Sequence, residues 1–285
     1  KQKTAYEIGV RLVGSEMCIR DRYNYFLTKL SLPPAFSIFC LVSSSVYCMN
    51  DAVDFKNDSR DEVNKLRPVA SGLIGRAHAV TFSISLLLVG IVTSYILVSP
   101  VLTGIVCTYY LMNLLYSIYF KQVIQLGALL VSLGFVLRVY AGAFVISVEV
   151  SSWLVLVTFF TAMFISLMKI RQKCILKDSN APGNAFFISY LSSAVNITAG
   201  LVMVLYCLWV ILGQQLIQDQ RMLISVPFVV YGIFRIIFLM YENQYMRDPT
   251  TLLFKDKPLL ITFGLWLASC LVALYFNQVI GYLTV

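Results

Sequence analysis

Charged residues are scarce in this sequence. Asp, Glu, Lys and Arg together make up 13% of its 285 residues, whereas 59% of the residues are hydrophobic and the mean hydropathy is +0.80. A soluble domain of this length carries far more charge. The apolar runs are continuous and do not alternate with a period of two, which argues against a membrane barrel. The composition therefore indicates an integral membrane protein built from helices.

The sequence also has little of what nucleophilic catalysis or zinc binding requires. His78 is its one histidine, and its seven cysteines include no CxxC pair. Ser-His and Cys-His catalysis need a histidine beside the nucleophile, and His78 is expected at the surface where a span begins. Six of the cysteines lie in or beside apolar runs as small packing residues, so neither a disulfide framework nor a zinc site is supported.

Eight apolar runs are long enough to cross a bilayer as helices, which takes roughly 20 residues each. They lie at about 34–50, 77–98, 101–119, 126–147, 152–169, 188–213, 222–241 and 258–280. The sequence therefore predicts an all-α fold, a polytopic membrane helix bundle that forms one transmembrane domain over residues 23–285.

The first 22 residues, KQKTAYEIGVRLVGSEMCIRDR, differ in kind from the rest. They lack the apolar core and small-residue cleavage site of a signal peptide. KQKTAYE is one reading frame of a flow-cell primer, and LVGSEMCIRD is one frame of a transposase adapter. We therefore expect residues 1–22 to be translated sequencing-adapter DNA, and we expect an early helix to be missing with the true N-terminus.

Lysine and arginine are unevenly distributed among the loops between the apolar runs. Thirteen lie in loops 51–76, 120–125, 169–187 and 242–257, and only Arg221 lies in the loops on the other side. The thirteen are Lys56, Arg60, Lys65, Arg67, Arg76, Lys121, Lys169, Arg171, Lys173, Lys177, Arg247, Lys255 and Lys257. Cytoplasmic loops are rich in these residues, so the first set is predicted to face the cytoplasm. Setting topology and contacting lipid headgroups would by itself explain most of them.

Two further arginines, Arg138 and Arg235, lie inside apolar runs. An arginine that faces lipid is costly, so each is expected to face a partner or a polar cavity. A buried ion pair, a carbonyl cap and a ligand site all remain open for them.

Four aspartates follow the first apolar run at regular intervals. Asp51, Asp54, Asp58 and Asp61 are three, four and three residues apart, so on a helix that continues the run they share one face. Neighbouring carboxylates repel one another unless a cation lies between them. Mg²⁺ binds oxygen ligands and shares carboxylates with substrate phosphates. The pattern favours a site for a magnesium-bound diphosphate over its alternative, a solvated acidic helix end.

Basic residues accompany the acidic segment and recur later in the chain. Lys65 and Arg67 follow the aspartates within a few residues, and Lys169, Arg171 and Lys173 cluster at the end of a later run. Such side chains hold phosphate oxygens that a metal leaves free, although a topology anchor would also explain the later cluster. Diphosphate is a good leaving group once its charge is neutralised. The residues therefore suggest a transferase that positions a lipid and a diphosphate substrate.

The segment NDAVDFKND, residues 50–58, resembles the NDxxDxxxD signature of the UbiA-type intramembrane prenyltransferase superfamily. Within that superfamily, the chain is most similar to the decaprenyl-phosphate phosphoribosyltransferase family over about residues 34–280. The segments that carry this similarity, in order, are SSSVYCMND, RPVASG, YSIYFK, GFVLRVYAGA, the stretch from SSWLVLVTFF to KIR, PFVVYGIFR and KDKPLL. The resemblance implies a nine-helix bundle, with the ninth helix at the missing N-terminus, and a central cavity that opens to the cytoplasm.

The resemblance also implies an activity, a membrane location and a set of site residues. The family transfers 5-phosphoribose from phosphoribosyl diphosphate to a polyprenyl phosphate for cell wall biosynthesis, in the cytoplasmic (inner) membrane. Asp51, Asp54 and Asp58 would be catalytic and would hold Mg²⁺. The residues implied to contact substrate phosphates are Asn50, Lys65, Arg67, Lys121, Lys169 and Arg171. No nucleic-acid partner is expected.

The sequence departs from that family at four places. Asp61 and Glu62 replace a usual His-Pro pair, Gly127 replaces an aspartate, Lys173 replaces an acidic residue, and Asn196 replaces another aspartate. Three of these changes remove or invert a negative charge.

Two alternative functions remain. A prenyltransferase acting on a polyprenyl diphosphate and an aromatic acceptor would need a second acidic motif near residues 169–180, where the sequence has only Asp178. An inactive paralogue or a transporter would fit the multi-span architecture, but the sequence shows neither an internal repeat nor paired broken helices.

Overall fold

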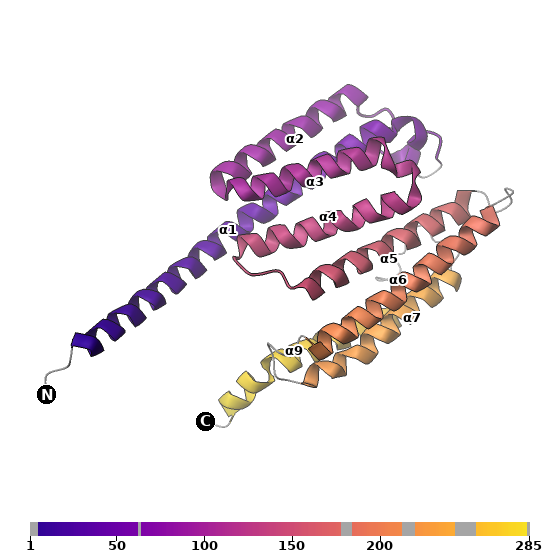
Figure 1. Ribbon diagram of the computed structural model, residues 1–285. Helices are drawn as coiled ribbons and strands as arrows, with labels where there is room; N and C mark the ends of the chain where they lie inside the picture. The colour runs from indigo at the N-terminus through magenta and orange to yellow at the C-terminus, as the bar shows by residue number, and fades with distance from the viewer. Residues whose placement is uncertain (1–4, 62–63, 178–183, 213–219, 243–254, 284–285) are drawn as a thin grey trace. The chain divides into compact units, whose positions relative to one another are not determined.

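The structure is a computed structural model that describes residues 5–61, 64–177, 184–212, 220–242 and 255–283 (Figure 1). Its long helices are α1 (Ala5–Asp58), α2 (Arg76–Leu97), α3 (Pro100–Ile118), α4 (Ile124–Val145), α5 (Ser152–Lys177), α6 (Asn184–Leu212), α7 (Val226–Glu242) and α9 (Lys257–Leu283). Short 3₁₀-helices lie at Asn64–Leu66 (η1), Phe120–Gln122 (η2) and Gln220–Ser225 (η4).

The predicted all-α membrane fold is confirmed. Among the described residues, seven helical segments are long and apolar enough to cross a membrane, beginning with Leu32–Asp58 and ending with Met222–Glu242. The eighth predicted span, 258–280, lies within α9, whose side chains are described as far as Ala273 and form an apolar segment from Lys257. The protein is therefore a multi-pass integral membrane protein, as its composition indicates.

The helices form two compact units. The first consists of Lys1–Gln122 and Leu137–Val150, and the second consists of Val123–Val136 and Ser151–Val285. Helix α4 gives its first half to the second unit and its second half to the first. Each unit is described separately below.

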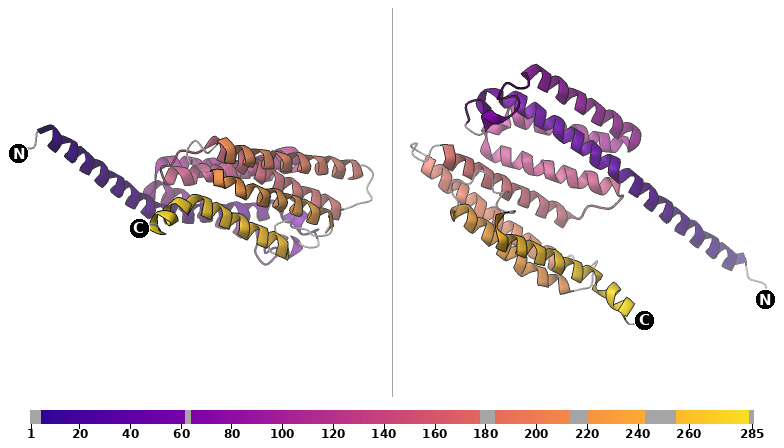
Figure 2. Two further views of the ribbon diagram at one scale, coloured as in Figure 1. Left: turned by 90° about the horizontal axis from the view of Figure 1, so that it is seen from below. Right: turned by 180° about the vertical axis from the view of Figure 1, so that it is seen from behind.

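In the first unit, α1 packs against α2 and α3 (Figures 1 and 2). The Ser45 hydroxyl donates a hydrogen bond to the Ser83 carbonyl over 2.7 Å, and the Ser83 hydroxyl returns one to the Ser45 carbonyl over 2.8 Å. A Cβ at Gly90 would lie 2.7 Å from a methyl group of Val42, so only glycine permits this approach. Small residues and paired hydroxyls of this kind hold membrane helices in close contact. The α1–α2 pair thereby fixes the end of α1 that carries the aspartates.

In the second unit, α5 packs against α6, α6 against α7, and α7 against α9 (Figure 2). Its core gathers buried side chains from these helices, among them Phe164, Leu167, Leu191, Val195 and Met240. This packing brings the last turns of α5 and α7 against α6.

An ion pair joins α7 to the start of α9. Arg235 Nη2 lies 2.7 Å from Asp256 Oδ2, and its Nε donates to Oδ1 over 3.3 Å. Asp256 Oδ1 also accepts the Leu259 amide over 2.9 Å, which caps α9. The Arg235 guanidinium holds the pKa of the Asp256 carboxyl below its usual range. The expectation that Arg235 faces a partner is confirmed, and that partner is a carboxylate.

Two predicted boundaries were wrong. A loop was expected over 169–187, but α5 continues to Lys177 because residues 169–177 contain neither proline nor glycine to end it. The four aspartates were expected on one helix, but α1 ends at Asp58, so Asp61 lies in the turn that follows.

Candidate functional site

The last turns of α1 present three carboxylates on one face. Asp54 and Asp58 are 6% and 7% exposed, and Asp51 is half-buried. The C-terminal end of a helix carries partial negative charge, so acidic side chains there are unfavourable unless cations neutralise them. The structure supplies those cations from two other segments of the first unit.

The turn after η1 supplies the first cation. A single nitrogen of Arg67, Nη1, lies 2.8 Å from Asp51 Oδ1 and 3.1 Å from Asp58 Oδ2. Asn64 Nδ2 also donates to Asp58 Oδ1 over 3.2 Å. Gly72, whose φ of 80° suits glycine, lets the chain turn back beside α1. Arg67 therefore bridges two carboxylates that lie two helical turns apart.

The end of α3 and η2 supply the second cation. Lys121 Nζ forms an ion pair with Asp54 Oδ2. One turn earlier on α1, the Asn50 side-chain oxygen is hydrogen-bonded to the Ser117 hydroxyl. The predicted site residues Asn50, Asp51, Asp54, Asp58, Arg67 and Lys121 are thus brought together in one place.

This arrangement suits a divalent cation with few protein ligands. In the part of the chain that the structure describes, no group of three or more His, Cys, Asp or Glu side chains is placed to hold a metal ion. Asp54 faces Lys121, whereas Asp51 and Asp58 converge on one positively charged nitrogen. Mg²⁺ is usually bound by one or two carboxylates, with waters and substrate phosphates completing its shell. Asp51 and Asp58 match that requirement for one or two carboxylates.

Two further predicted residues lie at the margin of this site. The Asp61 carboxylate accepts a hydrogen bond from the backbone N–H of Asn64 over 3.2 Å, so it caps the turn that carries η1. The side chain of Lys65, in η1, is exposed.

The end of α5, in the second unit, has a different character. Lys169 is exposed, whereas Arg171 is 3% exposed. Arg171 Nε donates to the Ser192 hydroxyl of α6 over 2.8 Å, and its guanidinium carbon lies 4.5 Å from the centre of the Tyr241 ring of α7. Sequence reasoning missed Ser192 and Tyr241, as it missed Asn64 and Ser117. The sequence marked them in one way only: each is a polar or amphipathic residue within or beside an apolar segment.

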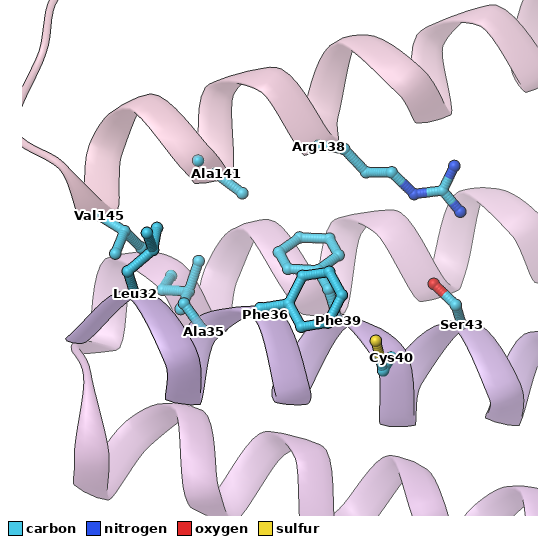
Figure 3. A pocket seen from close by; sticks show the side chains of 11 residues that line it. Leu32, Ala35, Phe36, Phe39, Cys40, Ser43, Arg138, Ala141 and Val145 are labelled. Atoms are coloured by element: carbon cyan, nitrogen blue, oxygen red, sulfur yellow. The ribbon is translucent and has the colours of Figure 1, made fainter. Parts of the chain in front are cut away.

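The first unit also contains an apolar cavity of about 420 Å³. It is lined by α1, α3 and the second half of α4 (Figure 3). Figure 3 shows Arg138 and Ser43 at one end of the cavity and Leu32 and Val145 at the other. Arg138 Nη2 donates to the Tyr109 hydroxyl, and its guanidinium carbon lies 4.9 Å from that ring centre. The expectation that Arg138 faces a partner is thereby confirmed.

The cavity and the aspartates lie on the same face of α1. Phe36, which lines the cavity, precedes Asp54 by 18 residues, or about five full helical turns. An apolar cavity and a charged site therefore follow one another along one side of one helix.

The sequence is similar to those of known proteins. Two curated proteins named decaprenyl-phosphate phosphoribosyltransferase are similar to the chain. One, from Mycolicibacterium smegmatis, is 26% identical over 90% of the chain and 84% of its own length. The other, from Corynebacterium glutamicum, is 27% identical over 64% of the chain and 57% of its own length.

A solved structure described as digeranylgeranylglyceryl phosphate synthase matches with a TM-score of 0.57 at 17% identity, over 88% of this chain and 90% of that one, which supports the fold alone. The profile of the UbiA prenyltransferase family matches residues 26–256. With its apolar helices and clustered aspartates, the chain therefore belongs to the UbiA prenyltransferase family, as a membrane-embedded prenyl or phosphoribosyl transferase.

Proposed function

We propose that the chain transfers 5-phosphoribose from phosphoribosyl diphosphate to a polyprenyl phosphate and releases diphosphate. The observation that carries this choice is the buried Arg171 at the end of α5. A second substrate that is itself a phosphate calls for a cation there, whereas a second metal-bound diphosphate would call for carboxylates. The names of the relatives support the same choice.

The aspartate site of the first unit would bind the donor. Asp51 and Asp58 would hold Mg²⁺, which supplies positive charge to the leaving diphosphate. Arg67 and Lys121, which face the carboxylates in the structure, are within reach of phosphate oxygens bound beside the same carboxylates. The bond between ribose C1 and the diphosphate oxygen breaks, and an oxygen of the polyprenyl phosphate bonds to C1. No nucleophilic side chain takes part, so positioning and charge neutralisation account for catalysis.

The apolar cavity would hold part of the lipid's hydrocarbon chain. It lies on the α1 face that carries the aspartates, so a chain seated there continues along the helix from the charged site. The excess of Lys and Arg in one set of loops supports an inner-membrane location with the charged site facing the cytoplasm.

The direct test is transfer of label. Purified protein in lipid nanodiscs is incubated with Mg²⁺, decaprenyl phosphate and phosphoribosyl diphosphate labelled in the ribose, and the lipid extract is counted. Label in a lipid whose mass equals that of the phosphoribosylated product is expected. Absence of label, under conditions in which the Mycolicibacterium smegmatis relative labels its lipid, would contradict the proposal.

A parallel reaction separates the alternative. It contains a polyprenyl diphosphate and an aromatic acid and lacks the ribose donor. Prenylated acid in this reaction, without label transfer in the first, would identify the chain as a prenyltransferase that uses the same aspartates.

A further inference from the structure

Arg171 is the one arginine in the described part of the chain that is deeply buried and still has an unsatisfied donor. Its Nη1 has no hydrogen-bond partner among the described residues, although the residue is 3% exposed. Arg235, also on a membrane helix, is paired with Asp256. A buried guanidinium with an unused N–H costs free energy comparable to a lost hydrogen bond to a charged group. Such groups are rare in folded proteins, and a functional role or a bound ion is among the reasons for keeping one.

The surroundings of Arg171 fix its orientation without consuming that donor. The Ser192 hydroxyl donates its proton to the Ile188 carbonyl over 2.7 Å, so toward Arg171 Nε it can only accept. Ser192 is therefore unable to donate to a ligand and acts on the guanidinium alone. The Tyr241 ring covers one face of the guanidinium at 4.5 Å and favours its charged form through the cation–π interaction.

Beyond the phosphate contact that the resemblance implies for Arg171, we propose that Ser192 and Tyr241 are its positioning residues, which present the edge of the guanidinium that carries Nη1 to the phosphate. Two oxygens of a phosphate match two N–H groups of a guanidinium, a fit that lysine cannot reproduce. The proposal rests on the proposed function for the phosphate that Arg171 contacts, which is either the polyprenyl phosphate or the donor's 5-phosphate. The anion site itself requires neither reaction.

The experiment measures phosphate binding separately from turnover. Purified protein is titrated with farnesyl phosphate, with farnesol and with Mg²⁺-phosphoribosyl diphosphate, and each affinity is obtained from the shift of the thermal unfolding midpoint. We expect Ser192→Ala to weaken one phosphate probe about tenfold and Tyr241→Leu to weaken the same probe about threefold. Farnesol, which has the chain without the phosphate, should bind all variants alike. The probe that weakens identifies the source of the phosphate.

Conservative variants separate positioning from packing. Ser192→Thr retains the hydroxyl and Tyr241→Phe retains the ring face, so both should bind like the original protein. Ser193→Ala is the matched control, because Ser193 is exposed and its hydroxyl bonds only within its own helix. If Ser192→Ala does not fold, Tyr241→Leu against Tyr241→Phe decides the question.

Unchanged affinity for both phosphate probes in Ser192→Ala and Tyr241→Leu would overturn the inference, even if label transfer is normal and the proposed function stands. Weakened phosphate binding without any label transfer would support the anion site while the proposed function fails.

Discussion

The charged ends of α1 and α5 differ in the sign of the charge that they hold and in how completely that charge is paired. At α1, three carboxylates lie close together and pair with two cations from other segments, Arg67 and Lys121. At α5, a buried cation is held by a hydroxyl and an aromatic ring, with one donor left over. Every carboxylate at α1 has a cationic partner without a ligand, whereas at α5 one donor of Arg171 has no partner among the described residues. We therefore expect removal of a cation to be harmful to folding at α1 and harmless to folding at α5, while both changes impair activity.

Loss of one carboxylate should have the largest effect. Asp51→Asn and Asp54→Asn are each expected to lower the transfer rate about 10²–10³-fold, because charge stabilisation of the leaving group is lost. Asn keeps the shape of the side chain, so the yield of folded protein should change little. The rate is measured by ribose-label transfer.

Asp61→Asn is the control for these variants, because Asp61 caps a turn and Asn can accept the same bond. Full activity in both Asp51→Asn and Asp54→Asn would remove the case for a diphosphate site at α1.

Loss of one cation should distinguish the two sites by the sign of the stability change. Lys121→Met leaves Asp54 buried without its partner and should lower the free energy of unfolding by about 1–3 kcal/mol, a range reduced because the Lys121 side chain is 35% exposed. Arg171→Met removes an unsatisfied buried charge and should be neutral or stabilising. Thermal unfolding in the same detergent measures both.

The double variant Asp54→Asn with Lys121→Met should recover most of the stability that Lys121→Met loses. A marked destabilisation by Arg171→Met would mean that the α5 site is a structural contact, and the comparison between the two sites would fail.

Magnesium should reveal Arg67 as a competitor for the carboxylates. A metal that binds Asp51 and Asp58 must displace the guanidinium nitrogen that contacts both. We therefore expect Mg²⁺ to raise the unfolding midpoint of Arg67→Ala by a few degrees more than that of the original protein. Arg60→Ala, which removes an exposed arginine nearby, is the control. Equal Mg²⁺ shifts in all three proteins would argue against a metal at these aspartates.

The ion pair at the start of α9 gives the smallest effect, which depends on pH. The pKa of Asp256 is lower in the folded protein than its ordinary value of 3.8. Its contribution to stability is therefore present above that pH and is lost as the pH falls through the lowered folded value. Asp256→Asn should flatten the loss of thermal stability in acid, because Asn cannot titrate.

Asp256→Ala should instead lower the unfolding midpoint at every pH, because alanine also removes the cap on the Leu259 amide. Identical acid profiles for the original protein and Asp256→Asn would show that the pair contributes nothing.

Much of the α1 site was predictable from the sequence. The spacing of Asp51, Asp54 and Asp58 required only that the helix continue past the apolar run, and it does so to Asp58. Arg67 and Lys121 could be named as phosphate contacts, but their present partners could not. Lys121 reaches Asp54 across 67 positions of the chain, and no local pattern encodes that contact.

The α5 site was only half predictable. The cluster around Arg171 was visible as a run of basic residues, but an exposed arginine and a buried one look alike in a sequence. The continuation of α5 to Lys177 and the packing of α6 and α7 decided that Lys169 is exposed while Arg171 is covered. Ser192 and Tyr241 could not be singled out, because their role exists only through that packing.

The sequence by itself determined what composition and local periodicity control: an all-helical membrane protein, its spans, and an acidic helix face. These follow from the hydrophobic effect and from helix geometry, which act over a few neighbouring residues. The tertiary structure decided which cation neutralises which carboxylate and which arginine retains an unsatisfied donor. Those outcomes depend on burial and on contacts between distant segments, because the strength of a charge interaction is set by the surroundings that the fold provides.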